Sequence, residues 1–216
     1  MGLTGADVGE LIALIALTVL LAIAGYTTML VSETTLYGFA HAESFAFEPG
    51  SYNLRSAKRP HLLRGSYEGH YVMISYGLFD YFSEAGDAGI STIAYDVPLH
   101  PKVHFKMRAS FPVGKRQFRT GDPAFDLWVS VQGGPKPFIQ SILSDRELRR
   151  ALKDTVSPTF SFTSTLSLTR AGPLMLRHKS VFLGRDRILR DLHLMKIVAD
   201  SLEEYVSSSD SPAAAE

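Results

Sequence analysis

The sequence contains no cysteine among its 216 residues. This absence excludes disulfide bonds, thiolate nucleophiles, cysteine-ligated zinc and iron–sulfur clusters, and it leaves the redox compartment open. The chain also lacks a net charge, because 22 basic residues balance 22 acidic ones. Nucleic-acid-binding domains usually carry a basic excess, so this balance argues against a nucleic-acid partner.

Sequence motifs for catalysis and cofactor binding are missing as well. The seven histidines are scattered, and His100 and His104 are the only pair at i, i+4 spacing. Pro98 and Pro101 exclude a helix there, and in a strand this spacing puts two side chains roughly 13 Å apart, too far for one metal ion. The stretch QGGPKP at 132–137 lacks the P-loop spacing, and the sequence has no HExxH or G-x-S-x-G motif. The sequence therefore predicts no metal, no cofactor and no catalytic residue.

Charge is absent from residues 11–31, which read LIALIALTVLLAIAGYTTMLV. A helix of this length covers roughly 30 Å, the thickness of the apolar core of a bilayer, so the run predicts a transmembrane helix after a short tail, residues 1–10. A core helix would carry polar residues on one side. A signal peptide would begin with basic residues, whereas this N-terminus has only Asp7 and Glu10. We therefore favour an uncleaved single-pass anchor.

Basic residues follow the apolar run and none precedes it. The positive-inside rule then places the part of the chain after the run in the cytoplasm. Basic clusters at a membrane surface attract anionic lipid head groups or an acidic neighbouring subunit, although most charge runs are simply solvated. The residues that set the orientation are Arg55, Lys58, Arg59 and Arg64, and the first three are also interaction candidates.

Residues 32–60 form an aromatic juxtamembrane segment, which we expect to be irregular. It is too rich in aromatic residues for a disordered linker, so it must lie on the following domain, on a partner subunit or on the membrane, and we favour the first two together. Its interaction candidates are Tyr37, Phe39, Phe45 and Phe47.

Residues 61–206 predict an α+β domain, with one antiparallel sheet of five to seven strands and two helices. Residues 103–108 alternate between apolar and basic side chains, as in a half-exposed strand, and residues 126–132 alternate in the same way. Trp128, the only tryptophan, then faces away from the apolar side and is an interaction candidate. Capping and periodicity predict helices at 144–155 and 185–206, and residues 207–216 are expected to be disordered.

The stretch RTGDPAFD at 119–126 combines a glycine, a proline and two carboxylates, as an active site or a tight corner would. We favour a corner, in which an Asx-type turn precedes proline, the glycine supplies permissive dihedrals and the phenylalanine is buried. In this interpretation Asp126 pairs with an arginine such as Arg119. The corner residues are Gly121, Asp122, Pro123, Phe125 and Asp126.

The box T-G-D-P-x-F-D, together with ILSDRELRRAL, LSLTRAGPLML and ILRDLHLMKIVADSLEE, resembles uncharacterised bacterial membrane-anchored proteins over roughly residues 60–205. The resemblance implies a membrane-tethered α+β domain with no known activity. Because the similar proteins are bacterial and the positive-inside rule gives the orientation, we expect a bacterial inner membrane with the C-terminal domain in the cytoplasm.

Two hypotheses follow. The favoured one is a non-catalytic, single-pass accessory subunit that docks on and stabilises a larger membrane protein complex, for which a respiratory or photosynthetic complex is a natural host. The alternative is a membrane-tethered enzyme or ligand-sensing domain that uses Asp122, Asp126 and nearby arginine or histidine residues.

Overall fold

The computed structural model describes residues 5–50, 60–77, 91–98, 102–109, 118–156, 164–170, 172–178 and 184–209. Its centre is one eight-stranded sheet in the order β1-β2-β3-β4-β8-β7-β5-β6, and every pairing is antiparallel. The strands are β1 (Ala46–Glu48), β2 (His61–Tyr67), β3 (His70–Tyr76), β4 (Ser91–Tyr95), β5 (His104–Ala109), β6 (Val129–Gly134), β7 (Thr165–Leu168) and β8 (Leu174–His178). The predicted α+β class and antiparallel sheet are thus confirmed.

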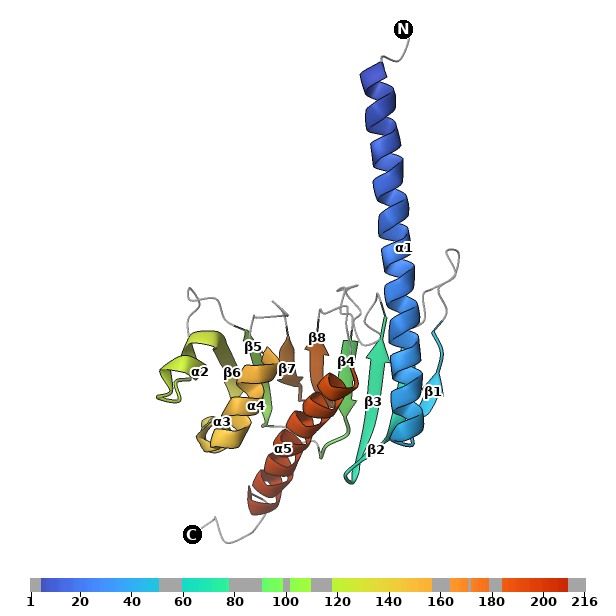
Figure 1. Ribbon diagram of the computed structural model, residues 1–216. Coiled ribbons are helices and arrows are strands. Elements are labelled where there is room, and N and C mark those ends of the chain that lie inside the picture. Colours follow the sequence, from blue (N-terminus) through green and yellow to red (C-terminus); the bar gives the residue numbers. More distant parts are fainter. Residues whose placement is uncertain are drawn as a thin grey trace.

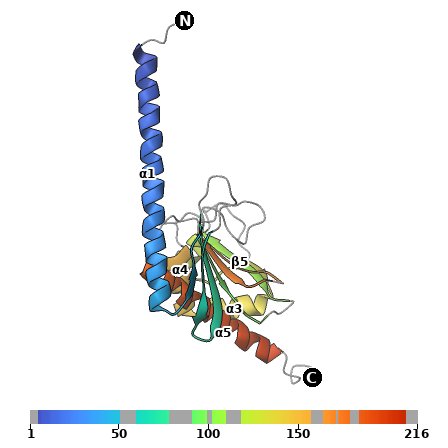
Figure 2. The same cartoon turned by 90° about the vertical axis from the view of Figure 1, so that its right-hand side faces the viewer.

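Five helices occur in the described ranges: α1 (Gly5–Ala42), α2 (Pro123–Trp128), α3 (Lys136–Ser144), α4 (Arg146–Val156) and α5 (Arg185–Ser209). Figure 1 views the sheet from the side on which α1, α3, α4 and α5 lie. The C-terminal part of α1 lies beside β1 and β2 at one edge, whereas α2 and α3 contact β6 at the other edge. The N-terminal half of α1 extends well beyond the sheet in both views (Figures 1 and 2).

The core fills the space between the sheet and this helical layer. The alternation predicted for β5 is present, because Val103, Phe105 and Met107 are buried while Lys106 and Arg108 are exposed. The stripe predicted for α5 is also present: its members are spaced by three and four residues, and each is fully buried. These residues are Ile188, Leu192, Met195, Ala199 and Leu202.

Several sequence-based boundaries are wrong. Residues 32–42 are not irregular but continue α1, and β1 adds a strand from within 32–60 to the sheet. The domain contains four helices after residue 60 in its described part rather than two, since α2 and α3 were not expected. α5 runs to Ser209 and so enters the segment expected to be disordered.

The strand expected at 126–132 begins only at Val129. Leu127 and Trp128 are the last residues of α2, which is too short to show helical periodicity in the sequence. Asp122 caps this helix and Pro123 starts it, a combination that favours a helix N-terminus as strongly as a turn.

No helix has the length and apolar character to cross a membrane within the residues described. The transmembrane assignment of residues 11–31 therefore stays a prediction.

Candidate functional site

The C-terminal part of α1 is held in the domain core. Leu36, Phe39 and Ala40 are at most 2% exposed and lie at i, i+3 and i+4, so they form one face of the helix. Just beyond the helix, Arg185 Nη2 donates to Glu43 Oε1 at 2.9 Å, which joins the end of α1 to the start of α5. The core and this ion pair fix α1 to the rest of the fold.

A group of rings seats this part of α1, and we call it the aromatic seat. Phe39 packs on Phe45 with 5.6 Å between ring centroids, and Tyr37 meets Phe47 edge to face at 5.8 Å. The Phe47 ring stacks on the imidazole of His61 at 5.8 Å, and His61 stacks on Tyr76 at 6.4 Å. The aromatic seat thus consists of Tyr37, Phe39, Phe45, Phe47, His61 and Tyr76.

Gly65 on β2 makes room for this arrangement. A Cβ atom at this position would lie 2.7 Å from Cγ of Phe45, closer than real contacts allow. The glycine therefore lets the Phe45 ring lie directly against the strand backbone.

His61 is the titratable group of the aromatic seat. Its Nδ1 accepts a hydrogen bond from the backbone N–H of Gly50 at 3.0 Å, and the residue is 1% exposed. Burial lowers the pKa of the imidazole below its ordinary value, while Glu33 acts weakly in the opposite direction. The neutral form, whose Nδ1 lone pair accepts this hydrogen bond, is therefore the form that this site stabilises.

The N-terminal half of α1 contrasts with the seated half. Its described large apolar side chains are 46–64% exposed and occur on every side of the helix. Within the apolar run, Thr18 and Thr27 donate their hydroxyls to the carbonyls of Leu14 and Ile23, four residues earlier in the helix. These bonds satisfy hydroxyls that would be costly in an apolar environment. The exposed apolar residues are Leu11, Ile12, Leu14, Ile15, Leu17, Val19, Leu20, Ile23, Leu30 and Val31.

The RTGDPAFD stretch is a tight corner closed by its own carboxylates. Asp122 Oδ1 accepts from the backbone N–H groups of Ala124 and Phe125 at 3.0 and 3.1 Å, so it is the N-cap of α2. Asp126 accepts from the backbone and hydroxyl of Thr120 and from the backbone of Gly121, rather than from an arginine. Gly121 has φ +81°, a conformation that favours glycine. Phe125 is 1% exposed and anchors the corner in the core.

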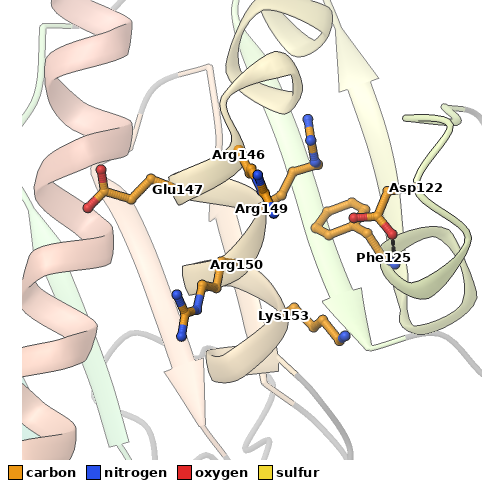
Figure 3. Close-up of a pocket in the computed structure, with 7 residues that line it drawn as sticks. All are labelled: Asp122, Phe125, Arg146, Glu147, Arg149, Arg150 and Lys153. Carbon is orange, nitrogen blue, oxygen red and sulfur yellow. Dashed lines mark hydrogen bonds between the residues drawn. The ribbon is translucent and has the colours of Figure 1, made fainter.

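Two adjoining clefts flank this corner. The first has a volume of about 680 Å³ and lies between α2 and α4, lined by Asp122, Phe125, Arg146, Glu147, Arg149, Arg150 and Lys153. In Figure 3, Lys153 of α4 extends toward the side on which Asp122 and Phe125 lie, whereas Glu147 and Arg150 point away from these two residues. The second, of about 490 Å³, shares Arg149 with the first and is lined by Phe118, Arg119, Thr120, Lys136, Gln140, Leu143, Ser144 and Arg149.

The interaction candidates from the sequence differ in how far the structure buries them. Phe39 and Phe45 are used inside the chain, and Phe47 and Trp128 are partly buried against the core. Tyr37 remains 62% exposed beside Phe47. Arg55, Lys58 and Arg59 lie outside the described residues.

One polar cluster was missed in the sequence. His178 Nδ1 lies 2.7 Å from Ser164 Oγ, and His178 Nε2 lies 2.9 Å from Asp191 Oδ2. Arg187 also reaches His178 Nδ1, at 3.2 Å. The three residues Ser164, His178 and Asp191 are at most 2% exposed, so a substrate cannot reach them in this conformation. No sequence motif links them, because they come from β8, α5 and the residue before β7.

In the part of the chain that the structure describes, no group of three or more histidine, cysteine, aspartate or glutamate side chains is placed to hold a metal ion. No protein-family model and no curated protein matches the sequence. A solved structure with a similar fold is the crystal structure of the mycobacterial trehalose monomycolate transport factor A, TtfA. It aligns with 78% of this chain and 93% of its own length, at 14% identity and a TM-score of 0.49. This likeness is too distant to carry a functional argument.

Proposed function

We propose that the chain is a non-catalytic, single-pass accessory subunit that docks on and stabilises a larger membrane protein complex. The observation that carries the proposal is the contrast within α1. One continuous helix has a C-terminal face buried in the domain core and an N-terminal half whose apolar side chains are exposed all round. A helix that is apolar on every side needs an apolar environment on every side.

The cost of leaving this half of α1 in water is large. Burying one large aliphatic side chain is worth about 1.5–3 kcal/mol when burial is complete. Ten such side chains, each about half exposed, amount to on the order of 10 kcal/mol of uncovered apolar surface. A bilayer and the helices of neighbouring subunits would cover this surface along its whole length.

The span itself is proposed from the full sequence. Residues 11–31 contain no charge, and several positions between 21 and 29 belong to this run although their side chains are outside the described set. The distribution of Arg55, Lys58, Arg59 and Arg64 supports a cytoplasmic domain at a bacterial inner membrane. The lipid bilayer and other membrane subunits are then the partners, and anionic head groups are a further one.

The two carboxylates on which the enzyme alternative was based have structural contacts. Asp122 and Asp126 both accept hydrogen bonds from the backbone of their own corner. Carboxylates engaged in this way serve the fold, and neither is paired with a histidine in the described structure.

Fractionation of native membranes tests the proposal. We expect the full chain to stay in the membrane pellet through a sodium carbonate wash. After mild detergent extraction it should migrate with other proteins, well above its own 23.8 kDa plus detergent. Release by carbonate, or migration as a lone species, would contradict the proposal. Mass spectrometry of the co-migrating proteins would identify the complex.

A further inference from the structure

Several basic side chains line the two clefts beside the corner, and five of them have no partner among the described residues. Arg119 and Lys136 line the smaller cleft, and Arg146, Arg150 and Lys153 line the larger one. These five cations take part in no hydrogen bond or ion pair within the described structure. Unpaired like charges in one place repel each other and create a local positive potential, although the chain as a whole is neutral.

Basic side chains outnumber acidic ones in the lining of the two clefts, where only Asp122 and Glu147 are acidic, and the nearby carboxylates form no ion pair with the five cations among the described residues. Asp122 caps α2, Asp126 closes the corner, and Asp145 accepts from the backbone N–H of Glu147 at 2.8 Å as the cap of α4. Glu147 lies 3.7 Å from His193 on α5, and in Figure 3 it points away from the other cleft residues. These carboxylates thus form contacts within the fold, whereas the five cations are available to bind a ligand.

Arg149 links the two clefts. Its Nη1 donates to the carbonyls of Leu143 and Ser144, at 2.5 and 3.0 Å, and so fixes the guanidinium at the end of α3 where both clefts meet. The apolar walls at this point are Phe125 and Leu143. The result is one recessed, positively charged trough with a partly apolar lining.

We propose that this trough binds an extended acidic segment of a partner protein. Carboxylates spaced along such a segment match cations spread over two connected openings, and its backbone can follow a recess of this size. The inference rests on the proposed function and deepens it, because it names the kind of partner surface on which the domain would dock.

Other anionic ligands match the trough less well. A bilayer surface is flat and cannot enter a recess between two helices. Single-stranded nucleic acid binds in grooves where exposed aromatic rings stack on the bases, but of the two rings that line the trough Phe125 is buried and Phe118 is partly buried against the core. A single phosphate would reach only a few of the five cations.

Binding of an acidic peptide tests the inference directly. The full chain in zwitterionic nanodiscs is titrated against a fluorescein-labelled oligoglutamate peptide, with oligoglutamine as the neutral probe, and fluorescence anisotropy is recorded. The charge-reversal variant is Arg146→Glu with Arg150→Glu, both at exposed positions of α4. The matched control is Arg170→Glu with Arg190→Glu, two exposed arginines outside the trough that change the net charge equally.

We expect saturable binding of oligoglutamate but not of oligoglutamine. The affinity should fall at least about tenfold in the trough variant, change less than about twofold in the control, and weaken with added salt. Equal effects in both variants, or no binding, would overturn the inference. Displacement of the peptide by phosphatidylglycerol vesicles or by oligothymidylate at lower concentration would overturn it as well, in favour of a lipid or nucleic-acid site.

The same variants separate this inference from the proposed function. If the chain stays in a large complex but does not bind the peptide, only the acidic-segment inference is contradicted. A chain that binds the peptide but leaves the membrane with carbonate contradicts only the proposed function.

Discussion

The hydroxyl of Tyr95 on β4 donates to the backbone carbonyl of Leu192, in the N-terminal third of α5, at 2.9 Å. Tyr95 is fully buried, and burial raises the pKa of its hydroxyl, so the group stays protonated and continues to donate. The contact joins residues 97 positions apart and holds α5 against the centre of the sheet.

Replacing Tyr95 with phenylalanine should weaken the attachment of α5 to the sheet without creating a cavity in the core. The ring stays in place and one buried hydrogen bond is lost, so we expect the free energy of unfolding to fall by about 1 kcal/mol. Urea denaturation of the full chain in detergent, followed by circular dichroism, measures this. Tyr71→Phe is the control, since Tyr71 is 52% exposed, and a loss as large in the control would contradict the assignment.

The buried cluster around His178 should respond very unequally to its two neighbours. Asp191→Ala leaves His178 and Arg187 without their carboxylate, and we expect a loss of roughly 3–5 kcal/mol. Ser164→Ala removes a neutral hydroxyl and should cost about 1 kcal/mol. Denaturant midpoints of the two variants decide this. Equal losses would mean that the carboxylate is not the organising group.

The aromatic seat should weaken on acidification through His61. Its pKa is lower in the folded state than the ordinary value of about 6.5, so the unfolded chain takes up a proton more readily than the folded chain. The contribution of His61 is therefore fully present above about pH 6.5 and is lost as the pH falls toward the lowered folded pKa. His61→Phe keeps a ring in the stack but removes this titration.

Thermal unfolding between pH 5 and pH 8 compares the two chains. We expect the difference in melting temperature between wild type and His61→Phe to narrow as the pH falls. A pH-independent difference would show that this imidazole does not titrate in that window.

The corner should behave as a structural element. Asp126→Ala removes the acceptor for the N–H groups of Thr120 and Gly121, and we expect the free energy of unfolding to fall by about 1–3 kcal/mol. Thr120→Val, which keeps the backbone N–H but removes the hydroxyl, should cost less. A folded, fully stable Asp126→Ala chain that has lost a cellular phenotype would instead support the enzyme alternative.

The apolar half of α1 should tolerate no charge if it lies in a bilayer. An arginine at the centre of a membrane helix costs about 2.5–3.5 kcal/mol, so Leu17→Arg with Leu20→Arg should move a large fraction of the chain out of the carbonate-washed membrane. Leu127→Arg is the control, because Leu127 is exposed on α2 rather than on α1. Retention of the double variant would count against a membrane span.

The sequence predicted those parts of the fold in which local pattern and tertiary structure agree. The stripe of Ile188 and Leu192 in α5 and the alternation of Phe105 and Met107 in β5 are repeated often enough to identify the element. The helix predicted at 144–155 is likewise present as α4, and Asp145 accepts from the backbone N–H of Glu147 at its start.

The errors have two physical sources. α2 is only six residues long, so Leu127 and Trp128 could be assigned to a strand as easily as to a helix. Long-range contacts could not be predicted from the sequence, as with Ser164, His178 and Asp191 or with the stacking of Phe47 on His61. The basic residues of α4 stand close together in the sequence, but only the fold shows that Lys136 from α3 joins the same trough.

The continuity of α1 from Gly5 to Ala42 sets a rotational phase between its two halves. Each residue of an α-helix advances the chain by about 100° around its axis and 1.5 Å along it. Inserting one alanine between the exposed half and Leu36 would therefore turn the whole apolar half by about 100° relative to the sheet, with little change in height. A neighbouring subunit that contacts one face of this helix would then meet a different set of side chains. The domain itself would remain folded.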